Sequence, residues 1–143
     1  MIYELIKTSE KDLQEVHEMI CILEDQKLDF EAFRSVYLAN LVDNDWCLFF
    51  ICLDEVHQGF CSLHFKNSLH HAAEIAELEE LIILPHFRGR GVGKEVIPLL
   101  QQVCKKRKVH QLEVCTNRKR EAAAAFYTTC GFLNSHHKMV ITF

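Results

Sequence analysis

Apolar residues recur every three or four positions in four segments of the chain, which predicts four amphipathic helices. The first is expected over residues 10–24, where Ser9 is suited to cap its N-terminus. The others are expected over residues 29–42, 92–108 and 121–129. Helices of these lengths carry one apolar stripe each, so each needs a further layer of structure to cover that stripe.

Apolar runs and short alternating segments predict six strands. They are expected at residues 2–6, 46–53, 57–66, 73–84, 111–116 and 136–143. Asp54-Glu55 separates the second and third of these and provides a turn, so that pair is expected to form a hairpin. The resulting order, β-α-α-β-β-β-α-β-α-β, predicts an α+β domain with helices on both faces of one sheet.

Length and composition restrict the class of protein. The chain has 143 residues, of which 49% are hydrophobic and 25% charged, so a single globular domain over residues 1–143 is expected. The net charge of −4 argues against a dedicated nucleic-acid binder. No apolar run reaches the roughly 20 residues that a membrane helix needs. The first residues lack the pattern of a signal peptide, and a cytoplasmic protein is expected.

The seven cysteines are an odd number, and no two of them form a CxxC pair. Most lie in apolar runs, such as Cys52 between Ile51 and Leu53. Reduced thiols in the core are therefore expected, and neither a disulfide framework nor a zinc ribbon.

The segment with the clearest chemistry is the Gly-rich turn at 88–93, between the strand ending near Leu84 and the helix that follows. Glycines permit positive φ and a close approach of a ligand to the backbone. The first amides of a helix have no partners within the helix and carry partial positive charge, so this turn is suited to a pyrophosphate. Because Gly89, Gly91 and Gly93 lie two apart, the turn contains no GxGxxG fingerprint, and it is not a Walker A loop because no GKS or GKT follows the required gap.

Two motifs together resemble the GNAT family of N-acetyltransferases. Arg88-x-x-Gly91-x-Gly93 is similar to the family's R/Q-x-x-G-x-G/A signature, and Phe126-Tyr127-x-x-x-Gly131-Phe132 is similar to its FYxxxGF ending. The motifs lie within residues 73–132. The resemblance implies the GNAT fold, in which a mixed, mostly antiparallel sheet of six or seven strands has helices on both faces.

The resemblance also implies that acetyl-CoA is the cosubstrate and indicates where it binds. The pyrophosphate would lie on the turn formed by Arg88, Gly89, Arg90, Gly91, Val92, Gly93 and Lys94. The pantetheine arm would pair with the strand segment Leu81, Ile82 and Ile83, and Asn117 and Arg120 would contribute contacts from a later loop. Tyr127 occupies the family position of the general acid that protonates the departing thiolate.

A base is also required, because only the neutral amine attacks the thioester. The candidates are Glu77, Glu79 and Glu80. Alternation along a strand puts Glu77 and Glu79 on one face and Glu80 on the other, unless a bulge intervenes. Glu77 is favoured, because it lies eleven residues before Arg88, as does the catalytic glutamate of the histone-acetylating members. A backbone amide near Ile82 or Ile83 is expected to stabilise the oxyanion.

A looser resemblance, which extends over nearly the whole chain, is to the bacterial aminoalkylphosphonate N-acetyltransferases. It rests on segments such as Ala32-Phe33-Arg34 and Leu69-His70-His71. It implies a small-molecule amine as substrate, and a divalent metal has been associated with those enzymes. His64, His70 and His71 are candidates to bind a divalent ion or to orient an anionic substrate, and Arg34 to meet an acidic group.

The sequence allows two alternatives to acetylation of an aminophosphonate. Either the acceptor is an aminoglycoside, a polyamine or a protein amine, or the domain binds CoA without turnover. The resemblance also allows a homodimer in which the last strand pairs with a second copy. Lys105-Lys106-Arg107-Lys108 is read as a solvated helix end, favoured there by the helix dipole, and not as a contact for nucleic acid.

Overall fold

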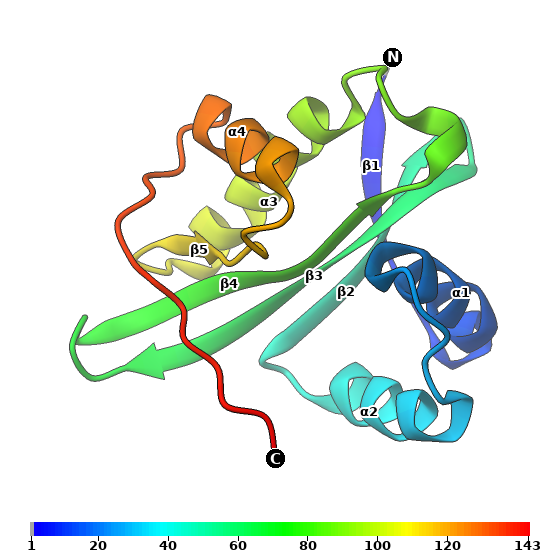
Figure 1. The fold of residues 1–143 in the computed structure, drawn as a ribbon, viewed down its shortest axis with the longest axis horizontal. Coiled ribbons are helices and arrows are strands. Elements are labelled where there is room, and N and C mark those ends of the chain that lie inside the picture. The colour runs from blue at the N-terminus through cyan, green and yellow to red at the C-terminus, as the bar shows by residue number, and fades with distance from the viewer. Residues whose placement is uncertain (1) are drawn as a thin grey trace.

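The computed structural model describes residues 2–143 and contains one five-stranded sheet and four α-helices (Figure 1). The strands are β1 (Tyr3–Lys7), β2 (Trp46–Leu53), β3 (Val56–Ser68), β4 (Ala73–Ile83) and β5 (Leu112–Val114). The helices are α1 (Leu13–Glu24), α2 (Phe30–Val42), α3 (Val92–Arg107) and α4 (Glu121–Thr129), with short 3₁₀ helices at Glu10–Asp12 and Pro85–Phe87. The strands follow their order along the chain, antiparallel except for the parallel pair β4–β5.

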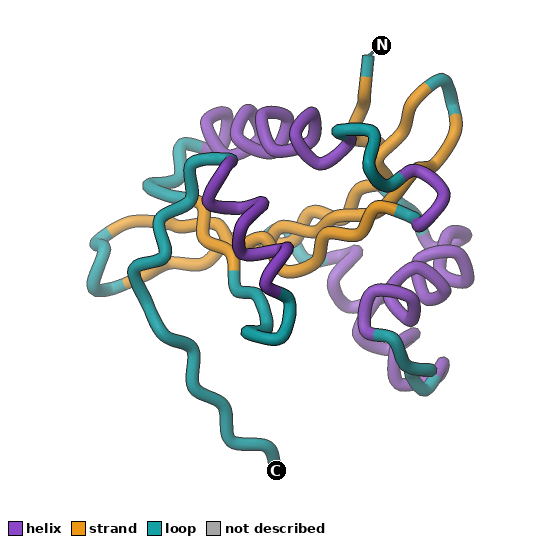
Figure 2. Tube along the Cα trace, turned by 45° about the horizontal axis from the view of Figure 1, so that its top comes forward, coloured by secondary structure: helices purple, strands orange, loops and turns teal. Residues whose placement is uncertain are grey.

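The sheet separates two layers of helices, with α1 and α2 on one face and α3 and α4 on the other (Figures 1 and 2). Alternating side chains of the strands feed a separate core on each face. Phe50, Phe60 and Ile82 pack with α1 and α2. Leu63 and Leu78, from the same strands β3 and β4, point the other way and pack with α3. The predicted α+β domain with helices on both faces is confirmed.

The strand expected at residues 136–143 is wrong. This segment is extended but pairs with no strand, so the described sheet has five strands and not six or seven. Its large apolar side chains are exposed, among them Met139 at 89% and Ile141 at 82%. The sequence has the composition of a strand there, but a strand forms only where a neighbouring edge accepts its backbone hydrogen bonds.

A bulge in β4 changes which glutamates share a face. Ser62 of β3 pairs with Glu80, but the next residue of β3, Leu63, pairs with Leu78, so Glu79 is the extra residue. Because the bulge absorbs one residue, Glu77 and Glu80 both face α1 and α2. The simple alternation that put Glu80 on the opposite face from Glu77 is therefore corrected.

Three of the seven cysteines lie in the core as expected, and three more are partly buried. All seven are free thiols; Cys52, Cys61 and Cys104 are buried, and Cys115 is exposed. Burial raises the pKa of the Cys61 and Cys104 thiols, which keeps them protonated. Within residues 2–143, no helix is long and apolar enough to cross a membrane.

Candidate active site

The central feature of the site is an opening between β4 and β5. Their parallel ladder ends at the pair Leu78–Val114, while β4 continues to Ile83. Leu84 N–H donates to the Gln58 carbonyl of the β3 side at 2.8 Å. Because amide directions alternate along a strand, the N–H groups of Leu81 and Ile83 point toward the open edge and that of Ile82 points toward β3. An extended ligand that enters the opening meets these two amides.

The Gly-rich turn lies just beyond this end of β4. Gly89 and Gly91 have φ values of +76° and +78°, in the region that side chains other than glycine rarely adopt. Gly91 is the N-cap of α3, and Glu95 N–H donates back to its carbonyl at 3.3 Å. The amides of Val92, Gly93 and Lys94 therefore have no partner within the helix and are available to an anion.

The third glycine of the turn has a packing role. A Cβ on Gly93 would lie 2.8 Å from the Phe126 ring of α4, closer than real Cβ contacts. The absence of a side chain at this position lets the first turn of α3 pack directly against α4. The turn and the helix that carries Tyr127 are therefore positioned against each other.

The cationic side chains expected to bind the pyrophosphate differ in the contacts they make within the protein. Arg88 Nε donates to the Ile83 carbonyl at 2.8 Å, which ties the turn to the end of β4. Arg90 lies 5.8 Å from the centre of the Phe87 ring, and Lys94 is exposed on α3. Arg120 reaches back to the end of α1, where it donates to the Leu23 carbonyl at 2.7 Å.

Asn117 precedes α4 in an exposed loop. Its Oδ1 accepts from Lys119 N–H at 2.9 Å, so the side chain shapes the loop itself. Among the cofactor candidates, the structure thus brings together the turn residues and the end of β4, and it places Arg120 beside α1 and not at the turn.

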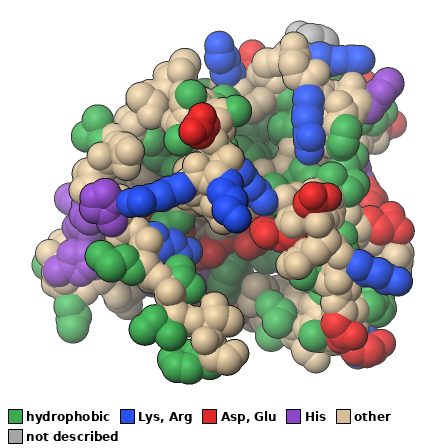
Figure 3. Space-filling model, viewed as in Figure 1, with side chains coloured by type: hydrophobic (Ala, Val, Ile, Leu, Met, Phe, Trp, Pro, Cys, Tyr) green, Lys and Arg blue, Asp and Glu red, His purple; other side chains and the backbone are tan. Residues whose placement is uncertain are grey.

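Three carboxylates lie side by side on β4 near the opening. Glu77 is only 17% exposed, and its Oε1 lies 3.9 Å from Lys66 Nζ. Burial, together with the neighbouring Glu77 carboxyl, raises the pKa of Glu79 to about 8, and the charge of Lys138 opposes that rise. Burial also raises the pKa of Glu80, although a hydrogen bond from Ser62 Oγ at 2.5 Å favours its charged form. Figure 3 shows acidic side chains in the middle of this face, beside Lys and Arg side chains.

Tyr127 lies on the other side of the sheet, in the core that α3 and α4 cover. Its ring packs edge-to-face on Phe126 and Phe132, with centroids 5.2 and 5.5 Å away. Burial raises the pKa of its hydroxyl to about 12. The phenol therefore stays protonated at any working pH and is able to donate a proton.

The histidine candidates lie in two places: the ring centres of His70 and His71 are 4.3 Å apart in the turn after β3, and His64 lies on the strand itself. His64 lies on β3, stacked on Trp46 with ring centres 4.4 Å apart, and its Nδ1 is 3.9 Å from Glu79. His70 lies in the turn after β3, where its Nδ1 is 3.2 Å from Ser68 Oγ. In the described part of the chain, no three His, Cys, Asp or Glu side chains are arranged to hold a metal ion. The side chains present therefore do not fit the expected divalent metal.

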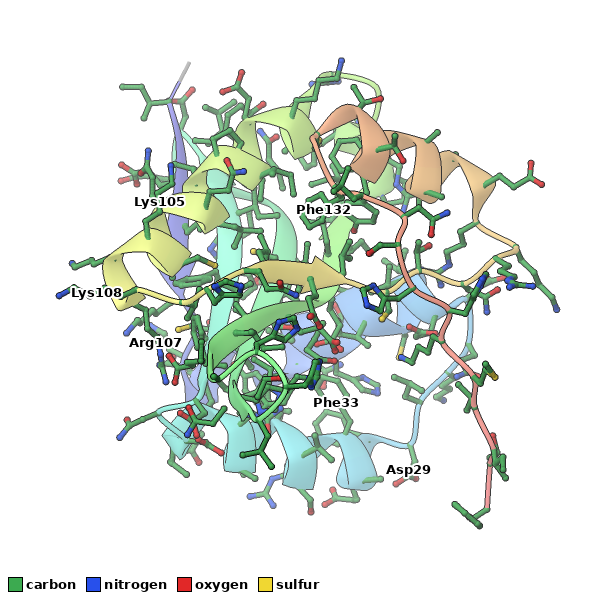
Figure 4. All side chains as sticks on the ribbon, turned by 90° about the vertical axis from the view of Figure 1, so that its left-hand side faces the viewer. Asp29, Phe33, Lys105, Arg107, Lys108 and Phe132 are labelled. Carbon is green, nitrogen blue, oxygen red and sulfur yellow. The ribbon has the colours of Figure 1, made fainter. Side chains whose placement is uncertain are left out.

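A pocket of about 230 Å³ lies between α1, α2 and the sheet, with Glu80 in its wall. Its aromatic residues are Phe33, Tyr37, Trp46 and Phe60, and Phe33 points from α2 toward the sheet (Figure 4). Sequence reasoning missed this pocket, because aromatic residues at helical spacing are also what a filled core requires. Arg34 is exposed on α2 and is not among the lining residues.

Comparison with known proteins agrees with this geometry. The model of the acetyltransferase (GNAT) family matches residues 8–132, and the chain belongs to that family. It is therefore an N-acetyltransferase, an acyltransferase that uses acetyl-CoA, and its family implies a small amine as acceptor.

One curated relative and two solved structures are similar to this chain over most of its length. An aminoalkylphosphonate N-acetyltransferase of Salmonella typhimurium is 32% identical over 137 residues, which cover 96% of this chain and 89% of that protein. A transcriptional regulator from Bacillus halodurans has a crystal structure that matches with a TM-score of 0.88 at 20% identity, over 99% and 100% of the two chains. An aminoglycoside N-acetyltransferase in complex with CoA matches with a TM-score of 0.85 at 16% identity, over 99% and 95%. At these identities the two structures establish the fold.

Proposed function

We propose that this chain transfers the acetyl group of acetyl-CoA directly to the primary amine of a small molecule, with Glu77 as base and Tyr127 as acid. The observation that carries the proposal is the opening between β4 and β5. It has a group of carboxylates on one face of the sheet and a protonated phenol within the core on the other. An arm that passes through the opening has a proton acceptor on one side and a proton donor on the other.

Acetyl-CoA binds in two places along this path. Its pyrophosphate accepts hydrogen bonds from the amides at the start of α3, with Arg90 and Lys94 adding positive charge. The pantetheine arm pairs with the open edge of β4, as an added strand would. Arg88 holds the carbonyl end of that edge in place, since it donates to Ile83.

The chemical step follows from these positions. Glu77 takes a proton from the bound ammonium, and the neutral amine nitrogen forms a bond to the thioester carbonyl carbon. A backbone amide on the open edge of β4 stabilises the oxyanion; Leu81 and Ile83 are the residues whose amides point there. The C–S bond then breaks, and its electron pair goes to sulfur, which takes the Tyr127 proton. The nitrogen, positively charged since the C–N bond formed, gives its extra proton to water, and exchange with water returns a proton to Tyr127 and removes the one held by Glu77. The products are an N-acetyl amine and CoA thiol.

The finer assignment of the acceptor is supported by one relative. Because the Salmonella typhimurium protein is named an aminoalkylphosphonate N-acetyltransferase, 2-aminoethylphosphonate is the first acceptor to assay. Lys66, near Glu77, is a cation that an anionic group would meet, and His64 lies near Glu79.

The test is the release of CoA thiol in the presence of acetyl-CoA and a panel of amines, measured with a thiol reagent. The panel contains 2-aminoethylphosphonate, 2-phenylethylamine, spermidine, an aminoglycoside and a lysine peptide. We expect saturable release that depends on an amine and is unchanged by EDTA. If acetyl-CoA binds but no amine causes release of CoA thiol, the proposal is contradicted. If EDTA abolishes activity, the reaction requires a divalent metal ion.

A further inference from the structure

The pocket between α1, α2 and the sheet lies next to the reaction path. Glu80, which forms part of its wall, comes two residues after Leu78, where the pairing of β4 with β5 ends. The carboxylate thus connects the opening for acetyl-CoA with the pocket. A small amine that presents its nitrogen to β4 has its remaining atoms directed toward this space.

The lining of the pocket is apolar apart from two groups. Eight of its ten lining residues carry aliphatic or aromatic side chains, and the polar ones are Asn40 and Glu80. No Lys, Arg or His side chain is among them. An anionic group placed there would lose its hydration, would meet no counter-charge and would lie near a carboxylate, which is strongly unfavourable.

The volume and the aromatic walls suit a different group. A cavity of about 150 Å³ with apolar walls holds benzene, so about 230 Å³ accommodates a phenyl-sized group with a short linker. Aromatic faces and a carboxylate also favour an ammonium at the mouth. Ser62 Oγ donates to one oxygen of Glu80, Oε1, and no residue of the described chain donates to the other.

We propose that the acceptor is an amine whose far end is uncharged and apolar, of the arylalkylamine or alkylamine class, and that the aromatic pocket binds this end. The inference rests on the proposed acetyl transfer. The preferred acceptor then carries a hydrophobic group where an aminoalkylphosphonate carries its phosphonate. Asn40, which lines the pocket from α2, is then a specificity-determining residue.

The first experiment compares two acceptors that differ only at the far end. 2-Phenylethylamine and 2-aminoethylphosphonate share an ethylamine chain and carry a phenyl ring and a phosphonate, respectively. We expect kcat/KM to be at least tenfold higher for 2-phenylethylamine. Equal values, or a preference for the phosphonate, would overturn the inference and leave acetyl transfer intact. If acetyl-CoA binds but none of the amines in the panel is acetylated, both the proposed function and this inference are overturned.

A charge variant tests the pocket directly. Asn40→Lys places an ammonium in the lining, and we expect it to lower kcat/KM for 2-phenylethylamine about tenfold and to raise it for 2-aminoethylphosphonate. Ala39→Lys adds the same charge at an exposed position of α2 outside the pocket, and it is expected to leave both values unchanged. Equal effects of the two variants would contradict the assignment.

A binding measurement gives an answer even if Asn40→Lys does not fold. Trp46 is the single tryptophan of the chain and lines the pocket, so its fluorescence reports occupancy without chemistry. We expect a saturable change in emission when 2-phenylethylamine is added to the wild-type protein, and none with 2-aminoethylphosphonate. If the Trp46 emission does not change when 2-phenylethylamine is added, the inference is overturned.

Discussion

Three glutamates in a span of four residues differ because of what surrounds each carboxyl group. Glu80 accepts a hydrogen bond from Ser62 and borders the aromatic pocket. Glu79, the extra residue of the bulge, lies beside the Glu77 carboxyl, and this like charge adds to burial in raising its pKa. Glu77 has Lys66 as a nearby cation. Neighbouring carboxyl groups of one strand therefore lie in distinct surroundings, and a distinct surrounding is the condition for a distinct role.

Glu77→Gln removes the proposed base without changing the size of the side chain. We expect kcat to fall by about 10²–10⁴-fold near neutral pH, because general base catalysis contributes on that order. The fall should shrink at high pH, where more of the amine is already neutral. Steady-state thiol release between pH 6 and 10 measures this, with Glu4→Gln on β1 as the control. A rate equal to wild type across the range would remove Glu77 from the role.

Tyr127→Phe removes the proposed acid and keeps the ring in its packing with Phe126 and Phe132. We expect kcat to fall roughly tenfold to a hundredfold with little change in acetyl-CoA affinity, because the hydroxyl acts on the departing thiolate. Tyr3→Phe, also in the core beside β2, is the matched control. Single-turnover rates and calorimetric titration with acetyl-CoA separate the two effects, and an unchanged rate would assign Tyr127 to packing only.

Glu79 should make the stability of the protein depend on pH. Its pKa in the folded state is about 8, above the ordinary value of 4.5, so the folded state binds more protons than the unfolded state between these values. Stability is then lost as the pH rises through this window. We expect Glu79→Gln to raise Tm by a few degrees at pH 9 and to leave it nearly unchanged at pH 4. A difference in Tm that is the same at both pH values would contradict the raised pKa.

At the scale of elements, the contact between the start of α3 and α4 connects cofactor binding with the acid. Gly93 has no side chain, and Phe126 fills the space that one would occupy. The ring precedes Tyr127 on the same helix and belongs to the α3-side core. The Gly-rich turn is therefore positioned by packing against α4 as well as by its own backbone geometry.

Gly93→Ala tests this contact. The added methyl group would overlap the Phe126 ring, and we expect a loss of about 1–3 kcal/mol in stability, together with about tenfold weaker binding of acetyl-CoA. Phe126→Leu in the same chain should restore part of both, because it opens the space that the methyl group needs. Thermal unfolding and calorimetric titration measure the two quantities. Additive losses in the double variant would show that the contact is not the cause.

At the scale of the whole molecule, the outer edge of β5 and the last eleven residues have no strand partner within residues 2–143. In the described part of the chain, β5 pairs with β4 and no strand pairs with its other edge. Residues 133–143 run as extended chain past the sheet (Figure 1), with large apolar side chains exposed. The apolar segment of one copy has the composition of a strand and is therefore suited to pair with the free sheet edge of a second copy.

We therefore expect two copies to associate through this segment, each pairing it with the edge of the other. Sedimentation velocity should give a dimer for the full chain at micromolar concentration and a monomer for a chain that stops after Phe132. Replacing Met139 and Ile141 by Ser should weaken the dimer without shortening the chain. A full chain that sediments as a monomer would contradict this prediction.

Much of the architecture could be predicted from the sequence, because it depends on local patterns. Hydrophobic periodicity predicted all four helices and five of the strands within a few residues. The spacing of Arg88, Gly91 and Gly93, with the later Phe-Tyr motif, was sufficient to predict the family, since the turn requires glycines where φ is positive.

Other properties were decided by contacts between distant segments. The bulge that brings Glu77 and Glu80 to one face depends on pairing with β3, and the side of a strand cannot be read from alternation once the register shifts. Arg120 lies at the end of α1 because of a contact across 97 residues. Residues 136–143 have the composition of a strand but no partner edge, and the aromatic pocket forms only where two helices meet the sheet. The sequence by itself determined the elements and the class of chemistry; only the tertiary structure decided which side chains share a face and what the acceptor would meet, because both depend on packing between segments that are far apart along the chain.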